Sequence, residues 1–202
     1  TEPGTLDPHR AEGVPASNVL RDLFEGLVME DPSGAYISGA AESWSLSEDA
    51  KTYVFKMREN GKWSNGDVVT AEDFVYGLRR SVDPATLSNY SSMLYPIKNA
   101  RDIVLGKRSS ETLGVRANGP TTLIIELEEP TPYFLSLLTH STTYATHRPS
   151  VEKFGARFTR PGNLVGNGAF KLEEWRVQSH IKLVRNTEYW DNKNTTLEEV
   201  YY

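Results

Sequence analysis

Residues 44–84 read WSLSEDAKTYVFKMRENGKWSNGDVVTAEDFVYGLRRSVDP, and this stretch decides the fold. Within it, Tyr53, Phe55 and Met57 alternate with Val54, Lys56 and Arg58. That period of two is typical of a strand with one buried face. Asn65-Gly66 then predicts a tight turn, because both residues tolerate a positive φ. We therefore expect a strand over residues 53–58, followed by a turn.

A helix is predicted directly after this turn. The run Thr70–Asp73 offers an N-cap followed by two acidic residues, which the positive end of the helix dipole favours. Phe74, Leu78 and Val82 follow at a spacing of four and form an apolar stripe. Asp83-Pro84 ends the helix, because the residue before a proline is pushed out of the helical region.

The same signals assign the rest of the chain. Helices are expected over residues 16–27, 100–105, 133–139 and 150–154, and hairpins join 113–117 to 122–127 and 169–177 to 180–185. Residues 31–34 form a turn that short strands could flank, and 197–202 begin a strand-like pattern. Residues 39–44 are interpreted as a loop or a single helical turn, and 187–190 as a turn of helix. Such hairpins and short helices predict a mixed α/β fold of the α+β type.

Composition excludes several classes of protein. The 202 residues include 38% hydrophobic and 10% aromatic residues, which is ordinary for a globular chain with a real core. A formal charge of −5 argues against a nucleic-acid partner, because proteins that bind nucleic acids usually carry a basic patch. No apolar run approaches the roughly 18 residues of a membrane helix. With no cysteine, neither a disulfide nor a thiolate metal site can form.

Signals of catalysis are weak. The four histidines are scattered, and no two share the i, i+4 spacing of a helical metal pair. No Gly-x-Ser-x-Gly nucleophile motif occurs, and residues 162–168 lack the Lys-Ser/Thr sequel of a phosphate loop, so they are interpreted as a tight turn. We expect neither an enzyme nor a cofactor. A hydrolase with a carboxylate pair across a cleft stays open, because sequence cannot place two acidic residues in one pocket.

Many short segments, in order along the whole chain, resemble the family 5 bacterial extracellular solute-binding proteins, and above all the oligopeptide-binding members. They are Leu6–His9, Glu12–Pro15, Arg21–Leu27, Ala41–Trp44, Tyr53–Arg58, Lys62–Gly66, Thr70–Tyr76, Arg80–Pro84, Glu152–Gly155 and Pro161–Asn163. The resemblance implies a type II periplasmic binding protein fold with two lobes. It also implies a receptor that captures extended oligopeptides and delivers them to a membrane ABC permease, in the periplasm or as a cell-surface lipoprotein.

The resemblance further implies site residues. Glu12, Gly13 and Val14 would run beside the peptide, where main-chain N–H and C=O groups can bind any sequence. Glu12 would add a carboxylate, and Tyr90 a ring that packs and a hydroxyl that hydrogen-bonds. His140 would line a side-chain pocket. The alternatives are a simple loop carboxylate for Glu12, a core residue for Tyr90 and a structural role for His140.

Domain organisation follows from the same resemblance. Residues 1–24 would begin lobe I, 25–147 would form an intervening lobe, and 148–202 would return to lobe I. We expect an N-terminal fragment that lacks the C-terminal lobe, because family members are far longer and the last residues stop within a strand-like pattern. The groups that hold the peptide's termini would lie in that missing lobe, so the chain alone would bind peptides weakly.

Other ligands and roles stay open at this stage. Relatives in the family bind dipeptides, nickel complexes, sugars or other solutes, and the residues that choose among them lie largely in the missing lobe. A chaperone-like or surface-adhesion role is compatible with the same fold, because a fold does not fix a function.

Overall fold

The computed structural model describes all of residues 1–202. Its helices are α1 (Gly13–Leu23), α2 (Ala71–Val82), α3 (Ala100–Val104), α4 (Phe134–Leu137) and α5 (Arg148–Phe154). Its strands are β1 (Val28–Glu30), β2 (Tyr36–Ser38), β3 (Ala41–Leu46), β4 (Thr52–Met57), β5 (Val115–Ala117), β6 (Thr122–Glu126), β7 (Phe170–Arg176), β8 (His180–Arg185) and β9 (Glu199–Tyr201). Short 3₁₀ helices fill several connections, among them Ser91–Leu94 and Ser141–Thr143. None of the helices combines the length and apolar character needed to cross a membrane.

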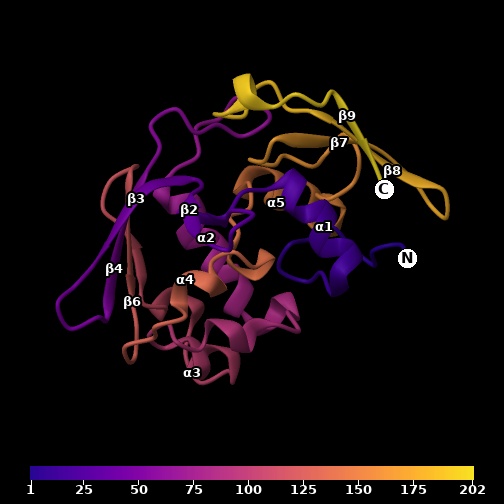
Figure 1. Cartoon of the computed structure of the whole chain (residues 1–202). Helices are drawn as coiled ribbons and strands as arrows, with labels where there is room; N and C mark the ends of the chain where they lie inside the picture. The colour runs from indigo at the N-terminus through magenta and orange to yellow at the C-terminus, as the bar shows by residue number, and fades with distance from the viewer.

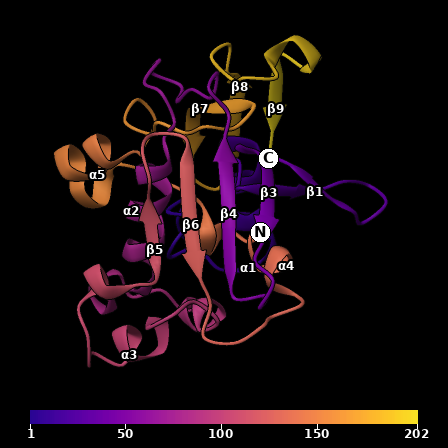
Figure 2. The same ribbon diagram turned by 90° about the vertical axis from the view of Figure 1, so that its left-hand side faces the viewer.

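A four-stranded antiparallel sheet in the order β3-β4-β6-β5 dominates the middle of the chain. Across it Trp44 pairs with Phe55, and Phe55 with Leu123. The predicted alternation of β4 is confirmed, because Phe55 and Met57 are buried while Lys56 is exposed. Helix α2, whose apolar stripe is buried, packs against β5 and β6, and Figure 2 shows the helix on one face of the sheet.

The expected turn and helix are confirmed, with one added contact. Gly66 has a φ of +92°, in the left-handed region that glycine tolerates. The Asp73 carboxylate accepts hydrogen bonds from the Thr70 main-chain N–H at 2.8 Å and from the Trp63 indole N–H at 3.0 Å. Asp73 therefore caps α2 and also holds the buried Trp63 in place.

A second, three-stranded antiparallel sheet in the order β7-β8-β9 lies beside α1, near both chain ends (Figure 1). The Gly168 N–H donates to the Leu23 carbonyl at 3.0 Å, so the segment before β7 runs along the end of α1. A Cβ atom at Gly168 would lie 2.4 Å from the Asp22 carbonyl oxygen, so only glycine allows this approach. Strands β1 and β2 pair antiparallel around the expected turn at 31–34 and form a third, two-stranded sheet. A single core of 40 buried apolar residues joins the four-stranded sheet, the three-stranded sheet and the helices between them.

The interpretation of residues 39–44 as a loop or helical turn was wrong. Residues 41–46 form β3, which pairs with β4 along its length. The Trp44 ring packs on Phe55 with centroids 6.4 Å apart. Polar residues such as Glu42 and Ser43 flank Trp44, so the segment lacks the apolar alternation that predicts a strand. Its extended form depends on pairing with β4.

Three helical segments also differ from expectation. Helix α1 begins at Gly13 and ends at Leu23, because the main chain is extended at Phe24 (φ −133°) instead of continuing to residue 27. The helix expected over 133–139 is reduced to the four residues of α4. Residues 187–190 form turns rather than helix. The helices at 100–105 and 150–154, both predicted hairpins and the final strand are confirmed.

Candidate functional site

Residues that the sequence assigned to one site meet around a small cavity of about 250 Å³. It is lined by Ala11, Gly13, Val14, Ser17, Tyr90, His140 and Ser141. Four of the five predicted residues are among them, and they come from three distant parts of the chain. The structure therefore places in one cavity lining residues that lie up to about 130 positions apart in the sequence.

Glu12, the fifth predicted residue, is not part of this lining and directly precedes Gly13, which is. Its main chain is extended (φ −131°, ψ 149°), and Gly13 (φ +80°) turns the chain into α1. The first N–H groups of a helix have no acceptor within the helix, and the Glu12 side chain does not cap them. Of residues 12–14, which we expected to run beside the peptide, only Glu12 has an extended main chain, and 13–14 form the exposed start of a helix.

The Glu12 carboxylate reaches across to the second wall of the small cavity. It accepts a hydrogen bond from the side-chain amide of Asn89, the residue before Tyr90. Glu12 is therefore more than a solvated loop carboxylate, because this contact joins the start of α1 to the loop that carries Tyr90.

Tyr90 and His140 form the aromatic wall of the small cavity. Their rings meet edge to face, with centroids 5.1 Å apart and an interplanar angle of 67°. Tyr90 is half-buried, so it does not belong to the core. The Tyr90 ring packs against His140 and borders the small cavity.

His140 combines a structural role with a place in the cavity wall. Its Nδ1 lies 3.2 Å from the Thr142 main-chain nitrogen and 3.0 Å from Thr142 Oγ1, so the ring caps the 3₁₀ helix Ser141–Thr143. Burial lowers the pKa of His140 from its ordinary value of 6.5. The ring is therefore neutral at neutral pH.

A larger cavity of about 550 Å³, here called the inner cavity, shares Ser17 and His140 with the small one. Its apolar lining includes Phe24, Met29, Met93, Leu137 and Tyr144, and its charged residues are Arg21, Glu25 and Glu30. Sequence reasoning missed all of these residues as site candidates. No local motif signals them, because they come from separate helices, strands and loops.

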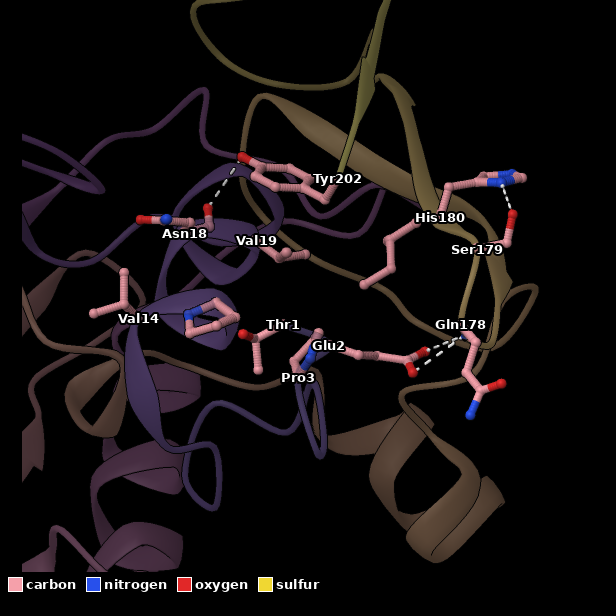
Figure 3. Close-up of a pocket in the computed structure, with 12 residues that line it drawn as sticks. Thr1, Glu2, Pro3, Val14, Asn18, Val19, Gln178, Ser179, His180 and Tyr202 are labelled. Atoms are coloured by element: carbon pink, nitrogen blue, oxygen red, sulfur yellow. Dashed lines mark hydrogen bonds between the residues drawn. The ribbon is translucent and has the colours of Figure 1, made fainter.

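The largest cavity, about 660 Å³, lies elsewhere (Figure 3). It is bounded by the N-terminal residues, α1, the β7–β8 turn and Tyr202, and Val14 is the only predicted site residue in its lining. The Glu2 carboxylate accepts from the Gln178 N–H within it, at 3.3 and 3.4 Å. Volume alone thus does not identify the candidate site, which we place at the small cavity and the inner cavity.

One cluster has the composition of a hydrolytic triad. His147 Nε2 lies 2.7 Å from Asp67 Oδ2, and His147 Nδ1 lies 2.6 Å from Ser150 Oγ. In a serine hydrolase the serine faces the substrate and the acid is buried. Here Ser150 is buried and the Asp67 side chain is 57% exposed, so the serine lies at the buried end of the cluster and the acid at the exposed end. The cluster instead fixes the start of α5. No group of three or more His, Cys, Asp or Glu residues could hold a metal ion.

Comparison with known families gives one match that extends over most of the chain. Residues 35–202 match the model described as "Bacterial extracellular solute-binding proteins, family 5 Middle". The periplasmic oligopeptide-binding protein OppA of Salmonella typhimurium is 48% identical over 204 residues, which cover 100% of this chain and 37% of that protein. The periplasmic murein peptide-binding protein MppA of Escherichia coli is 43% identical, with the same coverage.

Solved structures agree with these matches. The crystal structure of Haemophilus influenzae OppA in complex with RPPGFSPFR superposes with a TM-score of 0.97 at 44% identity, covering 100% of this chain and 40% of that one. The chain thus spans under half the length of the relatives it matches.

Proposed function

The chain belongs to the family 5 bacterial extracellular solute-binding proteins, and from this premise we propose that it forms one wall of a site for extended oligopeptides. The observation that carries the proposal is the convergence of Gly13, Val14, Tyr90 and His140 on one cavity. Val14 is 69% exposed and lines this cavity, and the edge-to-face rings of Tyr90 and His140 form its aromatic wall. Main-chain groups and aromatic faces together bind peptides with little regard to sequence.

We propose roles for the five residues on this basis. Gly13 and Val14 would present the free N–H groups at the start of α1 to the main chain of the peptide. Glu12, held by Asn89, would place a carboxylate beside the peptide, and Tyr90 would pack against it. His140 would border both the small cavity and the inner cavity, so a side chain of the peptide could pass from one to the other.

We also propose the domain division expected from the sequence: 1–24 and 148–202 in one lobe, and 25–147 in the other. The hydrogen bond from the Gly168 N–H to the Leu23 carbonyl supports the grouping of the two flanks. The whole protein would act without catalysis in the periplasm or at the cell surface, and would pass peptides to a membrane ABC permease. The names of the relatives, which are periplasmic oligopeptide-binding and murein peptide-binding proteins, favour this role.

Nuclear magnetic resonance titration of the chain with RPPGFSPFR tests the proposal. We expect shifts at Gly13, Val14, Tyr90 and His140, with a dissociation constant on the order of 1 mM, about −4 kcal/mol, because a single wall contributes only part of a two-lobed site. Val14→Asp should abolish these shifts. Val177→Asp is the matched control, because Val177 is equally exposed (70%) and lies outside the cavity lining.

Three outcomes would contradict the proposal. Absence of shifts at all four residues with millimolar peptide would remove the site. Micromolar affinity would show that one wall is already a complete site. Cleaved peptide after incubation would favour the hydrolase alternative.

A further inference from the structure

His140 differs from the other three histidines in how its ring nitrogens are used. His9 contacts Arg80 through Nδ1 and the Tyr144 carbonyl through Nε2. His147 contacts Ser150 and Asp67, and His180 contacts Ser179 and Glu174, again through both nitrogens. His140 uses only Nδ1, on Thr142. It is the one histidine in the chain with a ring nitrogen left for another molecule.

The contacts of Nδ1 fix the tautomer of the ring. The Thr142 main-chain N–H can only donate, so Nδ1 must accept and carries no proton. In a neutral imidazole the proton then sits on Nε2. Thr142 Oγ1 accordingly donates its hydroxyl proton to the same Nδ1 atom. The sequence His140-Ser-Thr142 thereby leaves a defined N–H donor on the free side of the ring.

Neighbouring contacts hold this donor in place. Thr142 is fully buried, and the Thr143 hydroxyl donates to the His140 carbonyl at 2.8 Å. The His140 main-chain N–H donates to the Leu137 carbonyl at 3.1 Å. The main chain is therefore tied on both sides, and rotating the ring would break the Nδ1 contacts. A donor that is already oriented loses little freedom when it binds.

The two cavities that His140 lines define the chemistry of a partner for Nε2–H. His140 borders both the small cavity and the inner cavity, and the charged residues of the inner cavity are Arg21, Glu25 and Glu30. A neutral N–H donor needs an oxygen acceptor and offers nothing to an N–H group or a cation. In a peptide the oxygen acceptors are main-chain carbonyls, the terminal carboxylate and the oxygens of polar side chains, and in RPPGFSPFR the only such side chain is serine.

We propose that His140 is a hydrogen-bond donor to the ligand, which binds a carbonyl or carboxylate oxygen of the peptide through Nε2–H, and that Thr142 is the positioning residue that fixes its tautomer. This inference rests on the proposed function. It goes beyond a lining role for His140, because it assigns the atom, the protonation state and the class of partner atom.

Imidazole ¹⁵N spectra of the free chain test the tautomer without any ligand. We expect the proton on Nε2 at neutral pH. Thr142→Val removes the hydroxyl donor to Nδ1 while keeping the main-chain N–H. Because that hydroxyl bond favours the neutral ring, the pKa of His140 should rise in this variant, whereas Thr142→Ser, which keeps the hydroxyl and loses only a methyl group, should leave it unchanged. A proton on Nδ1 in the wild-type chain would overturn the inference.

A pair of variants tests the donor itself with RPPGFSPFR. His140→Asn places an oxygen near the Nδ1 position, so it can keep the cap on Thr142 but offers no donor at the Nε2 position. His140→Gln extends an amide N–H to about the Nε2 position. We expect about fivefold to tenfold weaker binding for the Asn variant, the effect of one lost hydrogen bond, and weaker loss for Gln.

The same titrations separate the possible outcomes. If the Asn variant binds like wild type while Gly13 and Tyr90 still shift, the donor role is overturned and the peptide site stands. If nothing shifts in the wild-type chain, the proposed function itself fails. Repeating the series with a C-terminally amidated peptide, whose terminal oxygen carries no charge, separates the acceptors. The effect of the His140 variants should shrink if Nε2–H binds the terminal carboxylate, and it should stay the same if Nε2–H binds a main-chain carbonyl.

Discussion

Two buried carboxylates tie the N-terminal segment to the rest of the chain, and they are stabilised in different ways. Asp7 accepts two hydrogen bonds from the Arg80 guanidinium, at 2.8 and 2.7 Å, and the same guanidinium contacts His9 Nδ1 at 2.8 Å. Burial alone would raise the pKa of Asp7, but the Arg80 bonds and the nearby charges lower it overall. The cluster therefore contains a full ion pair, which links the N-terminal segment to α2.

Glu25 has no such counter-ion. Its carboxylate accepts from the Tyr189 hydroxyl at 2.6 Å and from the Trp190 indole N–H at 2.7 Å. Arg58 stacks on the Trp190 ring, 3.4 Å from its centroid, and forms no ion pair with Glu25. Burial raises the pKa of Glu25 to about 7, against the hydrogen bonds and the Arg58 charge, which lower it. Asp191 adds to the rise.

The difference teaches that two clusters built around equally buried carboxylates can respond to pH in opposite ways. Burial and the Arg80 charge lower the pKa of His9 to about 4, so the first cluster loses stability as pH falls from 6.5 towards 4. Glu25 binds a proton more readily in the folded chain than in the unfolded chain. The second cluster therefore loses stability as pH rises from 4.5 towards 7.

The largest effect is expected from Arg80→Met. Asp7 would then be a buried charge without a partner, which costs about 3–5 kcal/mol of unfolding free energy. Urea denaturation followed by circular dichroism measures the loss. Arg79→Met is the control on the same helix, because Arg79 pairs with Glu111, whose side chain is 77% exposed, and such pairs contribute below about 1 kcal/mol. Equal losses in the two variants would contradict the ion-pair account of the first cluster.

A smaller, pH-dependent effect is expected from Glu25→Gln. The rise in the pKa of Glu25 from 4.5 to about 7 corresponds to about 3 kcal/mol of unfolding free energy. The amide of the variant cannot ionise. The unfolding free energy of the variant relative to that of wild type should therefore rise by about this much between pH 4.5 and about 7. Denaturation curves at several pH values measure the difference. Glu30→Gln, on the exposed end of β1, should run parallel to wild type. A constant difference between the Glu25 variant and wild type would exclude titration of Glu25 there.

The smallest of the three effects is expected from Tyr189→Phe. Loss of the hydroxyl leaves one oxygen of Glu25 without its donor, which costs about 1–3 kcal/mol while the carboxylate is ionised. The loss should shrink at acidic pH, and the pKa of Glu25 should rise further. Tyr201→Phe is the control, because its hydroxyl contacts Glu199 at the surface and surface changes stay within about 0.5 kcal/mol. A loss independent of pH would point to packing instead of the hydrogen bond.

Local signals predicted most of the regular elements. The alternation of residues 53–57 and the stripe Phe74, Leu78 and Val82 gave β4 and α2 with boundaries within one residue. Strand β3 could not be predicted in this way, because its extended form depends on pairing with β4 and its own residues are mostly polar. The end of α1 at Leu23 likewise depends on a residue far along the chain, because Gly168 approaches the main chain there closely and donates to the Leu23 carbonyl.

The candidate site was only partly accessible from sequence. The resemblance singled out Glu12, Gly13, Val14, Tyr90 and His140, and the fold brings them to one place. Asn89, Ser17 and the residues of the inner cavity were missed, because nothing in their neighbours along the chain marks them. The same holds for the clusters around Asp7 and Glu25, whose partners lie more than 70 and 160 residues away.

The sequence by itself determined the family, the mixed α/β class and the identity of the predicted binding residues. These depend on local periodicity, turn chemistry and ordered short segments, which one chain displays without its fold. The tertiary structure alone decided which carboxylate has a counter-ion, which histidine nitrogen stays free and which residues share a cavity. Charge, protonation and shape at a buried atom depend on neighbours in space, and those neighbours are scattered along the chain.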